Sequence, residues 1–173
     1  KKRIFKKMLL IAAVAILVLI VCDICITKIY AQKIQHRYAS AEDGRELLLA
    51  NTKYYENFTQ NDIDFRLQKS DGTLDELLDA STSEISDFNF IEKYIIDRRI
   101  AKMARTLKKN SYELPQIEEI VFVKTDMTVE MGASGYTHGT EVYLNSTNIM
   151  VSLIPGAREY FDKLLWHELF HCL

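Results

Sequence analysis

Cysteine and proline are scarce in this chain of 173 residues, which has three cysteines and two prolines. Cys22 and Cys25 lie in a long apolar run near the amino end, which leaves Cys172 alone in the remainder. No intrachain disulfide can therefore stabilise that remainder, so its stability must come from packing or from a bound metal. It also contains no internal repeat and no low-complexity tract, so we expect one continuous folded domain.

Basic residues are in the minority after the first 37 residues. Eight basic residues and one acid precede Tyr38, whereas 14 basic and 23 acidic residues follow it. An acidic domain repels a phosphate backbone. We therefore expect no nucleic-acid partner.

The apolar run at the amino end predicts a membrane helix. Residues 8–26 are apolar apart from Asp23 and approach the ~20 residues that cross a bilayer as a helix. Five basic residues precede the run and three follow it closely, which by the positive-inside rule places the amino end in the cytoplasm. We expect a single-pass cell-membrane protein with an extracytoplasmic domain. A cleaved signal peptide, which would give a secreted protein, is the alternative, although Tyr30 is bulky for a cleavage site.

Helical patterns dominate the middle of the chain. Thr73 followed by Glu76 fits a capping box and predicts a short helix. A longer helix is expected from about Phe88 to Lys109, because apolar residues recur there at spacings of four, three and four. The apolar face of this helix consists of Ile96, Ile100, Met103 and Leu107.

After Pro115 the pattern changes from helix to sheet. Residues rich in β-branched side chains at 117–123, 128–131 and 140–144 predict short strands. The glycine-bearing stretch 132–139 predicts the mobile turn of a hairpin.

The last part of the chain again predicts a helix. Pro155 suits a first helical turn, and residues 157–173 carry apolar side chains on most faces, which predicts a buried helix. A transmembrane helix, a helical segment, a small mixed or antiparallel sheet and a final helix together predict an α+β fold.

This final helix carries a constellation that suits a metal. His167 and His171 are four residues apart, so a helix would direct both imidazoles to one point, as a shared metal ion requires. Glu168 is not needed as a ligand and would serve as general base for a zinc-activated water, which attacks a peptide carbonyl. The expected cofactor is Zn²⁺.

The five residues 167–171, His-Glu-Leu-Phe-His, resemble the His-Glu-x-x-His motif of the zincin metallopeptidases. The flanking residues Trp166 and Cys172 also match that family's pattern. The resemblance covers roughly residues 117–173 and implies a membrane-anchored zinc peptidase that hydrolyses peptide bonds.

The resemblance further implies a strand whose edge pairs with a peptide or protein substrate. The residues similar to this strand in position and character are Thr140, Glu141, Val142, Tyr143 and Leu144. Tyr136 and Tyr143 could assist an oxyanion, and His138 could touch substrate or metal. Strand packing for the tyrosines and an exposed loop for the histidine are the simpler interpretations.

In zincins the third protein ligand follows the second histidine, and only two residues follow His171 here. We therefore expect a zincin-like domain cut off in its active-site helix, and a fragment that is inactive alone. The expected segments are a cytoplasmic basic tail (1–7), a transmembrane signal-anchor (8–27), a juxtamembrane stalk or first helical region (28–67) and the N-terminal part of the metallopeptidase domain (68–173).

The main alternative is a non-enzymatic membrane-anchored binding or sensor module. In that case the motif is incidental, and His167, Glu168 and His171 form a hydrogen-bonded structural cluster. Such a module folds without metal, and substitution of Glu168 has little effect on it.

Overall fold

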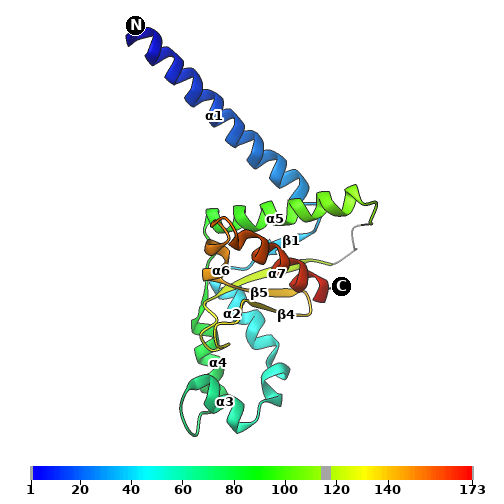
Figure 1. Cartoon of the computed structure of the whole chain (residues 1–173). Helices are drawn as coiled ribbons and strands as arrows, with labels where there is room; N and C mark the ends of the chain where they lie inside the picture. Colours follow the sequence, from blue (N-terminus) through cyan, green and yellow to red (C-terminus); the bar gives the residue numbers. More distant parts are fainter. Residues whose placement is uncertain (1, 114–117, 173) are drawn as a thin grey trace. The chain divides into compact units, whose positions relative to one another are not determined.

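A computed structural model of the chain describes residues 2–113 and 118–172 (Figure 1). The chain divides into two compact units, one of residues 1–34 with 97–114 and one of residues 35–96 with 115–173. The fold combines a long apolar first helix with a small mixed sheet and its covering helices. The predicted α+β class is therefore confirmed.

The first unit contains helix α1 (Lys2–Ala31) and most of helix α5 (Phe90–Lys109). The segment Phe5–Ala31 of α1 contains an 18-residue window with a mean hydropathy of 3.2, and it is long and apolar enough to cross a membrane. The predicted helix from about residue 88 to 109 is confirmed as α5, and Ile96, Ile100 and Met103 are buried along it as expected.

The sheet lies in the second unit, where the strand order is β1-β3-β5-β4. Strands β1 (His36–Tyr38), β3 (Ile120–Thr125) and β5 (Glu141–Asn145) run parallel, and β4 (Gly135–His138) pairs antiparallel with β5. A short strand, β2 (Ile85–Ser86), pairs antiparallel with the end of β3. Strands β3 and β5 are almost continuously buried, as expected for central parallel strands covered on both faces.

Four helical segments lie between β1 and β2. They are α2 (Ala41–Ala50), η1 (Thr52–Asn57), α3 (Gln60–Leu67) and α4 (Leu74–Ser83). The capping box predicted at Thr73 and Glu76 is present at the start of α4. The expected first helical region of residues 28–67 thus contains helices, but its reading as a stalk is wrong at residues 36–38, because β1 there pairs with β3 inside the folded unit.

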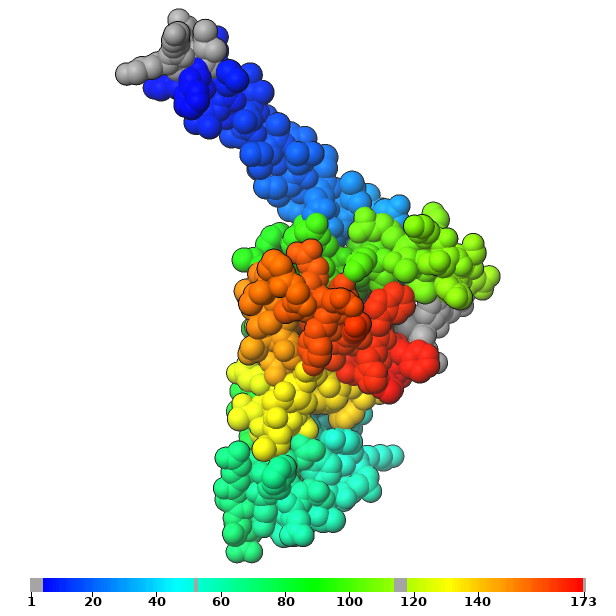
Figure 2. All heavy atoms as spheres, viewed as in Figure 1, coloured from blue at the N-terminus to red at the C-terminus, as the bar shows by residue number. Residues whose placement is uncertain are grey.

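Helix α6 (Ser146–Val151) follows β5 directly, and helix α7 (Ala157–His171) packs against β4. Figure 2 shows α7, in orange to red, at the surface of the second unit. Its buried residues are Phe161, Leu165, Glu168 and Leu169. The exposed fractions of Trp166 and Phe170 are 40% and 72%. The expectation of a buried helix is therefore wrong, because α7 buries one stripe at helical spacing and leaves other apolar side chains in solvent.

Two local predictions after residue 126 fail. Residues 128–131 form a turn and not a strand, since Met127 and Met131 adopt positive φ and the backbone N–H groups of Thr128 and Val129 donate to the Glu84 carboxylate. The stretch 132–139, expected as a mobile turn, contains β4. The part of the predicted strand at 117–123 that falls on Ile117 lies outside the described residues, as does Leu173 of the last helix.

Candidate functional site

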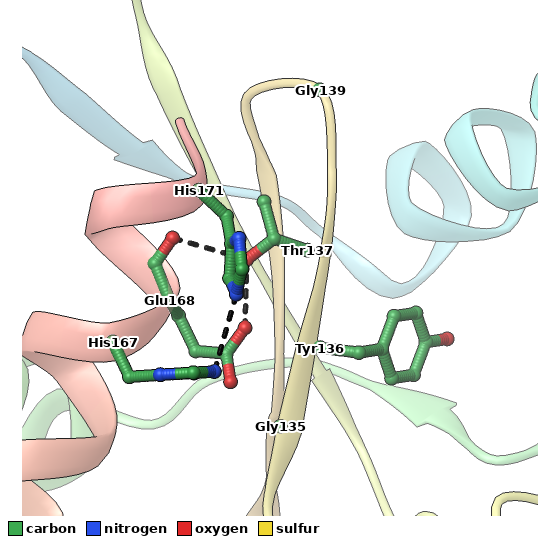
Figure 3. A pocket seen from close by; sticks show the side chains of 7 residues that line it. All are labelled: Gly135, Tyr136, Thr137, Gly139, His167, Glu168 and His171. Carbon is green, nitrogen blue, oxygen red and sulfur yellow. Dashed lines mark hydrogen bonds between the residues drawn. The ribbon is translucent and has the colours of Figure 1, made fainter. Parts of the chain in front are cut away.

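The two histidines of the motif face each other on α7. Their Nε2 atoms are 3.1 Å apart and their ring centroids 4.7 Å, with the ring planes almost perpendicular (Figure 3). Two imidazole ligands of one tetrahedral zinc, each at 2.0–2.1 Å, would place their nitrogens about 3.3 Å apart. His167 and His171 are both exposed, so a metal ion could reach them from solvent. Their geometry fits two ligands of one ion.

A complete metal site needs more donors than this pair. Across residues 2–113 and 118–172 the structure contains no group of three or more His, Cys, Asp or Glu side chains that could hold a metal ion. Cys172 does not extend the pair to such a group, and burial raises the pKa of its thiol to about 11. Its Sγ instead lies 3.6 Å from the backbone oxygen of Glu168.

Glu168 lies beside the histidine pair and is turned toward the sheet. Its exposed fraction is 4%, and Thr137 Oγ1 of β4 donates a hydrogen bond of 2.8 Å to its Oε2 atom. The same hydroxyl is 3.2 Å from the backbone oxygen of Glu168. A buried carboxylate needs such a donor, so Thr137 fixes the position of Glu168 next to the two imidazoles.

A pocket of about 430 Å³ opens between α7 and β4. Its lining consists of Gly135, Tyr136, Thr137, Gly139, His167, Glu168 and His171. Side chains alternate along a strand, so Gly135 and Thr137 share the face of β4 toward α7, and Gly139 follows in the turn after β4. Their small size leaves room for the pocket.

Gly135 and Gly139 have distinct roles in this arrangement. A Cβ atom at Gly135 would lie 3.0 Å from the backbone oxygen of Tyr143 and 3.6 Å from Glu168 Cγ. Gly139 has a φ of 59° and is the first of two residues joining the paired residues His138 and Glu141, a position that favours glycine in a tight hairpin.

The opposite face of β4 carries aromatic side chains. Tyr136 points away from the motif (Figure 3). Its ring stacks on that of Tyr143, with ring centroids 4.6 Å apart. His138 lies against Tyr54 at 4.6 Å, and burial lowers its pKa below the ordinary value. His138 is therefore part of an aromatic cluster on a strand, and the expectation of an exposed loop residue is wrong.

The proposed substrate-aligning strand needs a correction. Residues 141–144 of β5 pair with β3 on one side and with β4 on the other, so this segment offers no free edge to a peptide. Thr140 precedes β5, and its carbonyl accepts the backbone N–H of Val121. Among the described strands β4 ends the sheet on the side of the motif. The edge that a peptide could join is thus Gly135–His138.

Sequence reasoning missed Thr137 and Gly135, which line the pocket. The signal that could have found them is the small size of Gly135 and Thr137 at alternate positions, which is typical of one face of a strand.

Comparisons with known proteins add no assignment. No protein-family model, curated protein or solved structure matches this chain. The case for a function therefore depends on the geometry of the pocket between α7 and β4.

Proposed function

We propose that this chain contributes the motif helix and substrate edge of a zincin-type, zinc-dependent peptidase anchored to the cell membrane. One observation carries the proposal: the Nε2 atoms of His167 and His171 lie 3.1 Å apart beside the pocket that holds Glu168. Two imidazoles and one carboxylate at this spacing suit metal-assisted hydrolysis of a peptide bond.

In this proposal His167 and His171 hold zinc through their Nε2 atoms. A catalytic zinc site has three protein ligands and one open position, and the described residues supply two. The third ligand therefore has to come from outside the described part of the chain.

Glu168 is the proposed general base and acid. When bound, zinc supplies Lewis-acid activation of water and of the peptide carbonyl. The Glu168 carboxylate takes the proton of the attacking water and passes it to the leaving nitrogen. Thr137 restrains this carboxylate, because its hydroxyl donates a hydrogen bond to Oε2.

The edge of β4 is the proposed binding site for the substrate backbone. An extended peptide could add to Gly135–His138 by main-chain hydrogen bonds, which bind many sequences with little side-chain selectivity. Gly135 and Gly139, at the two ends of this edge, line the pocket that a substrate side chain would enter.

Helix α1 is the proposed membrane anchor. Its apolar part is long enough to span a bilayer, and the five basic residues at its amino end favour a cytoplasmic amino terminus. The peptidase unit would then lie on the extracytoplasmic side of the membrane and act there on peptides or proteins.

The test compares Glu168→Gln with Glu159→Gln in the full-length protein. Glu159 lies on the same helix and forms an exposed ion pair with Lys163, so it is a matched control. We expect Glu168→Gln to abolish hydrolysis of a mixed peptide library while zinc content stays constant, and Glu159→Gln to keep both. Full activity of Glu168→Gln would exclude the mechanism. A wild-type protein that holds no zinc and cleaves no peptide would favour a membrane-anchored binding module.

A further inference from the structure

The second half of α5 presents a basic face. Between residues 97 and 110 the chain has six basic residues and one acid, whereas the rest of the sequence after residue 37 has 8 basic and 22 acidic residues. Four of the six lie on one face of the helix, at spacings of four, three and four, and all four are exposed. These residues, the basic face of α5, are Arg98, Lys102, Arg105 and Lys109.

Two of these residues contact the end of α1 within the same unit. Arg98 pairs with Asp23 at 3.8 Å, and the Arg105 guanidinium lies over the Tyr30 ring, 5.4 Å from its centroid. The two contacts are seven residues apart along α1 and also along α5, so the basic face of α5 runs beside the last two turns of α1.

Asp23 is the one charged residue between Lys7 and Lys28 of α1. The uncharged stretch before it, Met8–Cys22, is 15 residues and about 22 Å long as a helix, and Lys6 and Lys7 at its other end can extend their ammonium groups to the headgroups. A carboxylate is unfavourable inside hydrocarbon, and its ion pair with Arg98 suits the headgroup region. Arg98 would then lie at the level of the lipid phosphates.

We propose that the basic face of α5 binds the anionic headgroups of the membrane that α1 enters. A basic face complements the negative charge of anionic headgroups. The face also contacts α1, the helix that would cross the bilayer, so a membrane surface is a better occupant than a protein partner. The consequence is a second attachment, which holds the end of α1 and α5 on the membrane surface. This inference is independent of the peptidase proposal, since no residue of the pocket takes part.

The test measures lipid selectivity of the full-length protein by native mass spectrometry. The protein is released from detergent micelles that contain equal amounts of phosphatidylglycerol and phosphatidylcholine with identical acyl chains, and the bound lipids are counted. Wild-type protein should retain phosphatidylglycerol in preference to phosphatidylcholine. In the double variant Lys102→Gln, Lys109→Gln, each replacement should lower the ratio of bound phosphatidylglycerol to phosphatidylcholine about fivefold.

The matched control is Lys53→Gln, Lys163→Gln, which removes the same charge from exposed positions of the second unit. It should bind phosphatidylglycerol as the wild type does. Equal retention of both lipids by the wild type would overturn the proposal, and so would an undiminished preference in the Lys102→Gln, Lys109→Gln variant. If that variant loses helix content by circular dichroism, Lys109→Gln alone, at the last residue of α5, gives the same comparison with a fivefold expectation.

Discussion

Thr137 Oγ1 donates a hydrogen bond of 2.8 Å to Glu168 Oε2 and thereby joins the last strand of the sheet to the motif helix. The two residues are 31 positions apart in sequence. Because Glu168 is 4% exposed, water cannot replace this donor freely. The position of the proposed general base therefore depends on a hydroxyl from β4.

Replacing Thr137 by Val removes the hydroxyl and preserves the shape of the side chain. We expect Thr137→Val to lower the free energy of unfolding by about 1–3 kcal/mol, since a buried carboxylate loses its donor. Thr137→Ser keeps the hydroxyl and should stay closer to the wild type. Thermal unfolding of the three proteins makes the comparison, and identical stability of the Val and Ser variants would show that the hydrogen bond does not restrain Glu168.

Gly44 of α2 lies against the sheet and should not tolerate a methyl group. Alanine is favoured over glycine within a helix by about 1 kcal/mol. A Cβ here would lie 2.9 Å from both Ile85 Cγ2 and Val123 Cγ1, and these side chains are buried and β-branched. Overpacking of this kind costs about 1–3 kcal/mol, so it outweighs the gain in propensity.

We therefore expect Gly44→Ala to be destabilised by about 1 kcal/mol in urea denaturation. Glu46→Ala, at an exposed position of the same helix, should change stability by less than about 0.5 kcal/mol. A Gly44→Ala protein more stable than the wild type would mean that α2 can move away from the sheet.

His138 should make stability depend on pH. Burial lowers its pKa in the folded protein below the ordinary 6.5, so the unfolded chain takes up a proton first as the pH falls. The unfolded state then binds more protons, and stability falls as the pH drops below about 6.5. His138→Gln cannot take up this proton. From pH 7.5 to pH 5 the melting temperature of the wild type should fall faster than that of His138→Gln. Parallel curves would contradict a lowered pKa at His138.

The ion pair between Lys124 and Glu92 joins β3 to the first turn of α5. Its N–O distance is 3.0 Å, and the two side chains are 12% and 6% exposed. Lys124→Met should destabilise the protein by about 3–5 kcal/mol, because it leaves the Glu92 carboxylate buried without its cation. Lys163→Met breaks the exposed pair with Glu159 and should change stability by less than about 0.5 kcal/mol. Chemical denaturation of both variants measures the contrast, and equal effects would show that the Glu92 carboxylate finds another partner.

The sequence predicted those elements whose signals are local. The capping box of Thr73 and Glu76 and the apolar spacing of α5 depend only on neighbours within a few residues, and both are confirmed. Residues 128–131 look like a strand by composition, yet their backbone is held in a turn by Glu84, which is more than 40 residues away. Composition alone does not contain that partner.

The sequence also predicted the candidate site only in part. The spacing of His167 and His171 follows from helix geometry, and the structure brings their nitrogens within 3.1 Å. Strand order is a tertiary property, so the sequence did not reveal that β5 is internal and β4 terminal. Thr137 was not predicted for the same reason, since its role depends on the hydrogen bond to Glu168 of the helix packed against β4.

The most direct test of the central claim is the zinc content per chain of the full-length protein, measured by elemental mass spectrometry. The variant is His167→Ala, and His138→Ala is the control because its imidazole lies on the opposite face of β4. We predict about one zinc per chain in the wild type and in His138→Ala, and loss of that zinc in His167→Ala. A folded wild type without zinc, or a His167→Ala variant that retains it, would contradict the claim that this histidine pair is a metal site.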